Sequence, residues 1–267
     1  MRFTRTAAIV LRQLYLIRGS ISRVLPLFIW VGIDMVLWGF ITKFLNSLTA
    51  SPYNFVAAML GAVLMWDFFA RVMQGVTMAF FEDVWSRNFL NFFATPLLIS
   101  EYVGGLVATS IMSSSIGLAV MLIVTGAFFG LSFFTYGLMF IPFLLVLFLF
   151  GIALGIIGSG VVLRLGPAAE WFIWPIPAIL SPFAGVFYPL SNLPKWMQYI
   201  GHLLPPSYVF EGMRSLIAGH PVPMRSLAFG IALAILDILL ASWFFTRMYK
   251  HAVRTGLIAR YSAETVS

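Results

Sequence analysis

Six long apolar runs constrain the fold of this chain more than any other feature. Each has about the 20 mostly apolar residues that a helix needs to cross the hydrocarbon core of a membrane. The runs lie at about residues 25–45, 54–77, 106–130, 136–163, 171–190 and 226–246. We therefore expect an all-α, polytopic membrane protein with six transmembrane helices, forming a single transmembrane domain over residues 1–267. Pro175, Pro177 and Pro182 are expected to break the fifth run.

Composition supports a membrane protein and argues against a soluble one. Apolar residues make up 61% of the chain and charged residues 9%, against roughly 45–50% and 25% in soluble domains. A soluble fold could not surround that much apolar surface with so few charges. The net charge of +7 does not indicate nucleic-acid binding, because the basic residues lie at the ends of the apolar runs instead of forming a patch with aromatics.

The distribution of lysine and arginine predicts the orientation. With the N-terminus in the cytoplasm, eleven of the sixteen basic residues lie on the inner side: Arg2, Arg5, Arg12, Arg18, Arg23, Arg87, Arg164, Arg247, Lys250, Arg254 and Arg260. Four lie outside: Lys43, Lys195, Arg214 and Arg225. Basic residues favour the cytoplasmic side, so both termini are expected there. No small-residue cleavage site follows the first run, so the N-terminus is not expected to be a cleaved signal.

The sequence lacks the motifs of common nucleotide-binding, metal-binding and hydrolase sites. There is no cysteine and no G-x-x-x-x-G-K-[ST] phosphate loop, and the three histidines lie far apart. No H-E-x-x-H or G-x-S-x-G motif occurs. We therefore expect no catalytic residues, no metal and no cofactor bound by this chain.

Residues 1–18 have an amphipathic pattern and predict an interfacial helix over 1–20. One face holds Phe3, Ala7, Val10, Leu11, Leu14 and Ile17; the other holds Arg2, Arg5, Thr6, Arg12 and Gln13. Such a helix is expected to lie in the membrane interface with its arginines toward anionic lipid. It would act either as a topology anchor or as a lining of the cytoplasmic entrance to a substrate path.

The cytoplasmic loop 82–101 predicts a short helix over 82–98. Glu82 and Asp83 are placed at its start, where the helix dipole favours negative charge, and Pro96 limits its end. One face carries Trp85, Phe89, Phe92 and Phe93, with Arg87 elsewhere. An aromatic stripe of this size must face the membrane surface or a partner protein.

The external stretch 191–225 holds prolines at 205–206, 221 and 223. Between them lie two aromatic-rich pieces, about 196–204 and 208–217, which are too short to span a membrane. We expect them to be re-entrant or interfacial helices on the outer face. Glu211 and Arg214 are spaced to form a structural pair.

Four charged residues lie inside the predicted spans: Asp34, Asp67, Arg71 and Asp237. Each costs roughly 2.5–3.5 kcal/mol at the centre of a membrane helix, so such groups face protein or water. Their similar depths predict one intramembrane polar network. It would either lock spans one, two and six together or form a proton relay or polar lining of a transport path.

Two local patterns resemble a known family. The block 180–216 contains SPF, GVFYP, LP and LPP at 181–183, 185–189, 193–194 and 204–206. Earlier in the chain stand WDFF at 66–69, NFL at 88–90 and TPL at 95–97. Together with the layout of the apolar runs, these motifs are similar to those of the ABC-2 type exporter permeases, and the resemblance covers essentially the whole chain.

The resemblance implies partners and a mechanism. Such permeases work as dimers, here a homodimer, in which each copy binds one cytoplasmic ABC ATPase that carries ATP and magnesium. The 82–98 segment would be the coupling helix, contacting the ATPase through Trp85, Arg87, Phe89, Phe92 and Phe93. ATP-driven closure would open a path lined mainly by spans one, two and five, where the candidates are Trp30, Trp38, Trp174, Phe183, Phe187 and Tyr188. Aromatic side chains suit sugars and amphiphiles, and they equally suit lipid.

The expected function is that of the permease subunit of an ATP-driven exporter in the bacterial cytoplasmic membrane. Its cargo would be an amphiphile, a glycan- or lipid-linked molecule or a drug, and the short loops do not distinguish among these. The alternative is an ATP-independent channel or lipid scramblase, which would need a continuous polar face on several spans. Only spans one, two and six carry ionisable residues.

Overall fold

The computed structural model describes residues 3–19, 21–48, 56–86, 91–92, 95–132, 134 and 136–257, and these ranges contain helices and turns but no strand. The long helices are α2 (Ile21–Leu48), α3 (Gly61–Trp85), α5 (Ile99–Phe129), α6 (Phe140–Leu165) and α11 (Met224–Thr255). The shorter ones are α1 (Phe3–Arg18), α7 (Glu170–Ile173), α8 (Ile176–Leu180), α9 (Lys195–His202) and α10 (Pro205–Ile217). A π-helical turn, η1 (Val56–Leu60), leads into α3.

Four segments of the described chain are long and apolar enough to cross a membrane: Val56–Trp85, Ile99–Phe129, Gly137–Leu165 and Met224–Thr255. At 1.5 Å per residue each exceeds the roughly 30 Å of a hydrocarbon core. They coincide with the second, third, fourth and sixth apolar runs. The protein is therefore a multi-pass, all-helical membrane protein.

The first and fifth apolar runs take different forms. The first lies within α2, a helix of 28 residues. The fifth is divided into α7, α8 and a series of turns that follows Leu180. Proline lacks the backbone N–H that a helix needs and disfavours helical geometry in the residue before it. Helix α8 accordingly stops shortly before Pro182, so the chain is broken in the region that the prolines predicted.

Several helices extend beyond the apolar runs. Helix α3 continues to Trp85, so Glu82 and Asp83 lie in its last turn and not at the start of a separate coupling helix. Helix α5 begins at Ile99 and includes Glu101 in its first turn. The expected position of Glu82 and Asp83 was wrong, because hydropathy falls wherever charges occur, whether or not the helix ends there.

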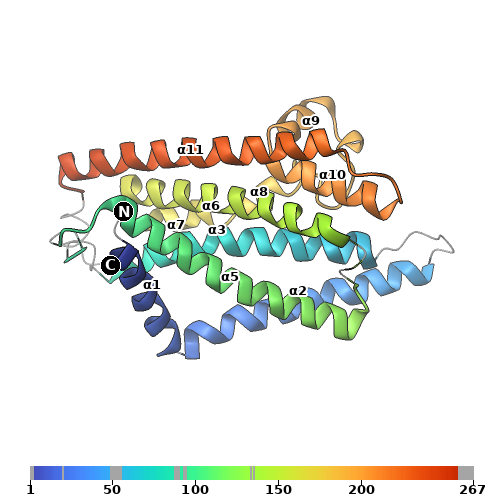
Figure 1. Ribbon diagram of the computed structural model, residues 1–267, viewed down its shortest axis with the longest axis horizontal. Coiled ribbons are helices and arrows are strands. Elements are labelled where there is room, and N and C mark those ends of the chain that lie inside the picture. Colours follow the sequence, from blue (N-terminus) through green and yellow to red (C-terminus); the bar gives the residue numbers. More distant parts are fainter. Residues whose placement is uncertain are drawn as a thin grey trace.

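The bundle has two distinct ends (Figure 1). Helix α1 and the C-terminal end of α11 lie at one end of the long axis, which we call the α1 end, and α9 and α10 lie at the other. Helix α3 packs against both α5 and α6, and α6 in turn packs against α11. Of the four candidate spans, the one that contains α3 is the most enclosed. In its most apolar stretch of 18 residues 72% of the residues are buried, against 22% in the corresponding stretch of α11. Helix α3 therefore forms the centre of the core.

Glycines allow α3 and α6 to approach closely. A Cβ atom added to Gly155 would stand 2.8 Å from Val76 Cβ and 2.9 Å from the Met73 carbonyl oxygen, and Gly151 is equally close to Val72. The spacing of four residues places both glycines on one face of α6, as in the small-xxx-small pattern of membrane helices. Thr77 Oγ1 also donates to the Gly155 carbonyl at 3.3 Å. Close backbone packing thus holds the core together.

We expect Gly155→Ala to destabilise the bundle by about 1–3 kcal/mol, because the added methyl group has no space between α3 and α6. The measurement is thermal unfolding of the purified chain in detergent, followed by tryptophan fluorescence. Gly32→Ala is the matched control, since none of the described residues outside its own helical turn lies within 4 Å of the position of its new Cβ. Equal melting temperatures for the two variants would contradict the close α3–α6 contact.

Candidate functional site

Helix α1 lies against α5 with its polar face inward. Ile9 is buried, and a Cβ on Gly105 of α5 would stand 2.6 Å from its Cβ. Gln13 is also buried, whereas Phe3, Leu11 and Tyr15 are 87%, 54% and 70% exposed. The prediction that the arginine face of α1 points to lipid was therefore wrong for Arg5 and Arg12, which bind carboxylates of the protein. Arg2 lies outside the described residues.

Arg12 forms an ion pair with a buried carboxylate at the end of α3. Its Nη2 lies 2.6 Å from Asp83 Oδ1, and the Tyr102 hydroxyl of α5 donates to Asp83 Oδ2 at 2.7 Å. Both Asp83 and Tyr102 have no exposed surface. A negative charge in the last turn of a helix is disfavoured by the helix dipole. The guanidinium and the phenol offset that disadvantage.

Arg5 forms the corresponding contact with the start of α5. Its Nη1 lies 3.4 Å from Glu101 Oε2 and also donates to the carbonyl of Pro96. Glu101 is 1% exposed, and its Oε2 accepts a hydrogen bond from the Leu98 N–H at 3.1 Å. This carboxylate therefore caps the N-terminus of α5 and binds α1 at the same time.

The two contacts together join α1 to both helices that flank the loop 86–98. We call this set of residues the α1 clamp: Arg5, Arg12, Asp83, Glu101 and Tyr102. Sequence reasoning did not find it, although one signal was present. Arg5 and Arg12 are seven residues apart, two turns of a helix, and acidic residues stand at both ends of the loop.

The predicted coupling residues divide into an outward and an inward group. Arg87, Phe89 and Phe93 lie outside the described residues. Trp85, the last residue of α3, is 44% exposed and stacks on Phe81 with ring centroids 5.5 Å apart. Phe92 turns inward: the Arg12 guanidinium lies 4.9 Å from its ring centroid, and the Tyr102 ring lies 5.5 Å away. Trp85 thus remains available to a partner, whereas Phe92 packs against the clamp.

The four charged residues predicted within the membrane spans do not all lie together. Arg71 of α3 interacts electrostatically with Asp67 on its own helix and with Asp34 on α2. Its side chain passes over Gly117 of α5, where an added Cβ would stand 3.3 Å from Arg71 Cδ. Asp237 lies apart on α11, half-buried, with no charged partner among the residues that the structure places. Three of the four predicted members therefore form a group between α2, α3 and α5.

The aromatic candidates for a substrate path lie on the surface of α2 and around the broken fifth segment. Trp38 of α2 stacks on Phe187, with ring centroids 5.1 Å apart and planes at 10°. The Tyr188 hydroxyl donates to the Pro182 carbonyl at 3.0 Å. Phe183 meets the Trp196 ring edge-on at 6.2 Å. Trp30 and Trp174 are 63% and 45% exposed.

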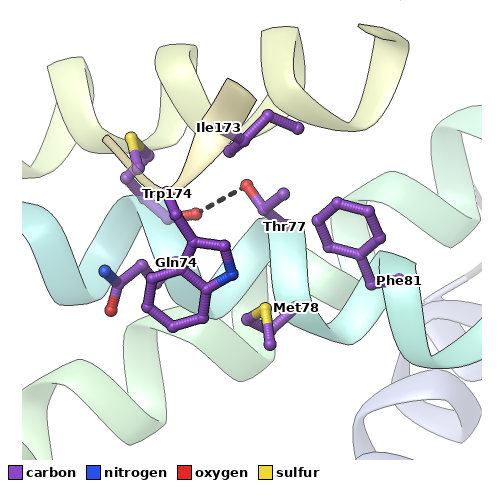
Figure 2. A pocket seen from close by; sticks show the side chains of 7 residues that line it. Gln74, Thr77, Met78, Phe81, Ile173 and Trp174 are labelled. Atoms are coloured by element: carbon purple, nitrogen blue, oxygen red, sulfur yellow. Dashed lines mark hydrogen bonds between the residues drawn. The ribbon is translucent and has the colours of Figure 1, made fainter. Parts of the chain in front are cut away.

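A small pocket lies where α7 meets α3 (Figure 2). It is lined by Met73, Gln74, Thr77, Met78 and Phe81 of α3 and by Ile173 and Trp174 of the fifth segment. Its volume of about 10 Å³ is no more than a single water molecule requires. Trp174 Nε1 donates to Glu170 Oε1 at 2.9 Å, which fixes the indole ring. The lining is mostly apolar, with the Gln74 amide as a polar group.

In a comparison with protein-family models, residues 8–218 match the family described as ABC-2 type transporter. The match begins within α1 and ends directly after α10, so it includes most of α1, the loop 86–98 and the broken fifth segment. A search of curated proteins found no match.

We expect Arg12→Gln to destabilise the chain by about 3 kcal/mol, because it leaves the charge of Asp83 buried without its cation. Adding Asp83→Asn should restore most of that loss, since the double variant buries no unpaired charge. Thermal unfolding of the two single variants and the double variant measures this coupling. Strictly additive effects would show that the ion pair contributes nothing beyond its separate side chains.

Proposed function

Because the chain belongs to the ABC-2 type transporter family, we propose that it is the membrane-spanning subunit of an ATP-driven exporter. Family membership and the candidate spans make it a multi-pass transport permease and not itself an enzyme. The sequence carries no phosphate-binding loop, so the ATP and magnesium would be bound by a separate cytoplasmic ABC ATPase. The observation that carries the proposal is the loop 86–98, which the α1 clamp attaches to the core of the bundle.

The proposed topology has six spans with both termini in the cytoplasm of a bacterium. Helix α2 supplies the first span, and α7 with α8 the broken fifth. The excess of arginine and lysine near the α1 end supports this orientation. The α1 end, with the loop 86–98, then faces the cytoplasm, and α9 and α10 lie at the outer face as re-entrant or interfacial helices.

In the proposed complex two copies of the chain form a homodimer, and each binds one ATPase through the loop 86–98. The exposed side chain of Trp85 supports this contact, because exposed aromatic residues are enriched at protein interfaces. Arg87, Phe89 and Phe93 are further candidates from the sequence. Phe92 would act from the inner side, where it supports the loop against Tyr102.

The substrate path would run between the two copies, beside α2, α3 and the broken fifth segment. Freed backbone groups at membrane depth are tolerated only against protein or a cavity, which supports a path along the prolines of this segment. The stacked pair of Trp38 and Phe187 favours a cargo with a substantial apolar part. An amphiphilic drug and a lipid-linked glycan both have this property.

We expect a tagged full-length chain, extracted from its native membrane in mild detergent, to bring down a P-loop ATPase. Trp85→Glu should reduce the ATPase recovered at least tenfold, because it places a charge where an apolar contact is proposed. Trp196→Glu is the control: its ring is 59% exposed, and it lies on α9 at the opposite end of the bundle. Recovery of the wild-type chain alone, or ATP hydrolysis by the chain alone, would overturn the proposal and favour an ATP-independent channel or scramblase.

For the group of Asp34, Asp67 and Arg71 we propose a structural role, joining α2 to α3. Arg71→Gln should then lower the melting temperature and the yield of assembled complex, because two carboxylates lose their shared cation. The triple variant Asp34→Asn/Asp67→Asn/Arg71→Gln should recover part of both. Should Arg71→Gln assemble normally but fail in transport, these charges would belong to a proton relay or to the transport path instead.

A further inference from the structure

One face of α11 changes from apolar to basic along a single line of exposed residues, which we call the α11 stripe. Its members are spaced three or four residues apart, so that they are neighbours on the helix surface. In chain order they are Leu236, Leu240, Trp243, Arg247, Lys250 and Arg254. The ring of Trp243, where the apolar part ends, is 61% exposed.

The opposite face of α11 is turned toward the bundle. Ala234, Ala241, Phe245 and Ala252 are buried, and at 3.6 residues per turn they lie on the side of the helix away from the stripe. A Cβ atom added to Gly160 of α6 would stand 3.5 Å from Phe245 Cα. Helices α11 and α2 lie along opposite edges of the bundle (Figure 1). The stripe is therefore remote from the path proposed beside α2, and it faces the surroundings of the bundle.

The change from apolar to basic occurs where the apolar run ends, at about residue 246. At 1.5 Å per residue, Arg247 and Lys250 lie about 2 and 6 Å beyond that point along the helix, and Arg254 lies about 12 Å beyond it. The headgroup layer on each side of a hydrocarbon core is roughly 5–8 Å thick. Flexible side chains extend the reach of arginine and lysine. The basic part of the stripe is thus at the depth of the lipid phosphates, and the apolar part is at the depth of the acyl chains.

In the described part of the chain, no carboxylate neutralises the basic part of the stripe. Arg247, Lys250 and Arg254 take part in none of the ion pairs found there. The sequence also has no aspartate or glutamate between residues 238 and 263. The Arg247 guanidinium lies 5.6 Å from the ring centroid of Trp243, a cation–π contact that joins the two parts of the stripe.

We propose that the α11 stripe binds an anionic phospholipid. Its phosphate would lie at Arg247, Lys250 and Arg254, and its acyl chains would lie along Leu236, Leu240 and Trp243. A zwitterionic lipid offers the same acyl chains without net negative charge, so the cations favour the anionic headgroup. Helix α11 lies beyond the residues that match the family. The inference rests on the proposed function only for the leaflet, which is the inner one when the C-terminus is cytoplasmic.

Quenching of Trp243 fluorescence by brominated lipid tests this site on the full-length chain in nanodiscs. The probes are dibrominated phosphatidylglycerol, which is anionic, and dibrominated phosphatidylcholine, which is zwitterionic, each diluted into unlabelled phosphatidylcholine. The chain has eight tryptophans, so the signal of Trp243 is the difference from Trp243→Phe in the same background. We expect half-maximal quenching at a fraction of phosphatidylglycerol about tenfold lower than that of phosphatidylcholine.

Arg247→Gln/Lys250→Gln should remove this preference, because the phosphate loses two of its three cations. Lys195→Gln/Arg225→Gln is the matched control. It also removes one lysine and one arginine, both exposed, from the starts of α9 and α11 at the other end of the bundle, and it should leave the preference unchanged. Arg247→Lys/Lys250→Arg keeps both charges and should retain the preference.

Thermal unfolding in detergent supplies a second measurement that does not depend on Trp243. Added phosphatidylglycerol should raise the melting temperature of the wild-type chain and of the control variant, because a ligand that binds only the folded state stabilises it. It should raise the melting temperature of Arg247→Gln/Lys250→Gln much less.

Equal quenching of Trp243 by the two lipids, or loss of the preference in both double variants, would overturn the proposal. Contact would then depend on acyl chains or on net charge alone. Quenching by neither lipid would overturn it in favour of a second copy of the chain that covers the stripe. Nanodiscs present the same lipids on both faces and contain no ATPase. A preference as expected, with no ATPase ever recovered from the native membrane, would support the lipid site and overturn only the exporter.

Discussion

The buried carboxylate of Asp83 is the interaction on which the α1 end of the molecule depends. It lies in the last turn of α3, where the helix dipole and the surrounding apolar core both disfavour a negative charge. Arg12 supplies the cation and Tyr102 the hydrogen bond. Because these partners come from α1 and α5, one requirement of charge compensation fixes both of these helices against the end of α3. Glu101 and Arg5 repeat the arrangement on the other side of the loop.

The core below this end is held by a different means. Glycines on α6 bring its backbone against α3, and hydroxyl groups such as Ser110 Oγ, which donates to the Val72 carbonyl at 2.8 Å, join α5 to α3. Lipid supplies no hydrophobic force between helices, so close contact and hydrogen bonds must hold them. The ionic clamp and the closely packed core meet in α3, which is the most enclosed of the four candidate spans in the described part of the chain.

Four of the six predicted spans are found as long apolar helices, whereas the contacts between helices were not predicted from the sequence. Apolar runs located the long helices, and Pro175, Pro177 and Pro182 located the break in the fifth segment, because both effects are local. The sequence prediction ended this helix too early, because Glu82 and Asp83 lower the local hydropathy. In the structure α3 continues to Trp85, and the charge of Asp83 is compensated by Arg12. The helical wheel of α1 separated an apolar from a polar face but wrongly directed Arg5 and Arg12 toward lipid. Which face meets protein depends on carboxylates 71 and 96 residues further along the chain, at Asp83 for Arg12 and Glu101 for Arg5, and no periodicity contains that information.

The inward direction of Arg5 and Arg12 has a consequence for how α1 responds to its surroundings. Dissolved ions weaken attraction between exposed charges over roughly 8–10 Å, and a basic helix held by anionic headgroups would loosen as salt rises. Here both guanidinium groups meet carboxylates inside the chain, and the face left open bears Phe3, Leu11 and Tyr15. The position of α1 is therefore set by contacts within the protein. We expect it to depend little on ionic strength or on the charge of the surrounding bilayer.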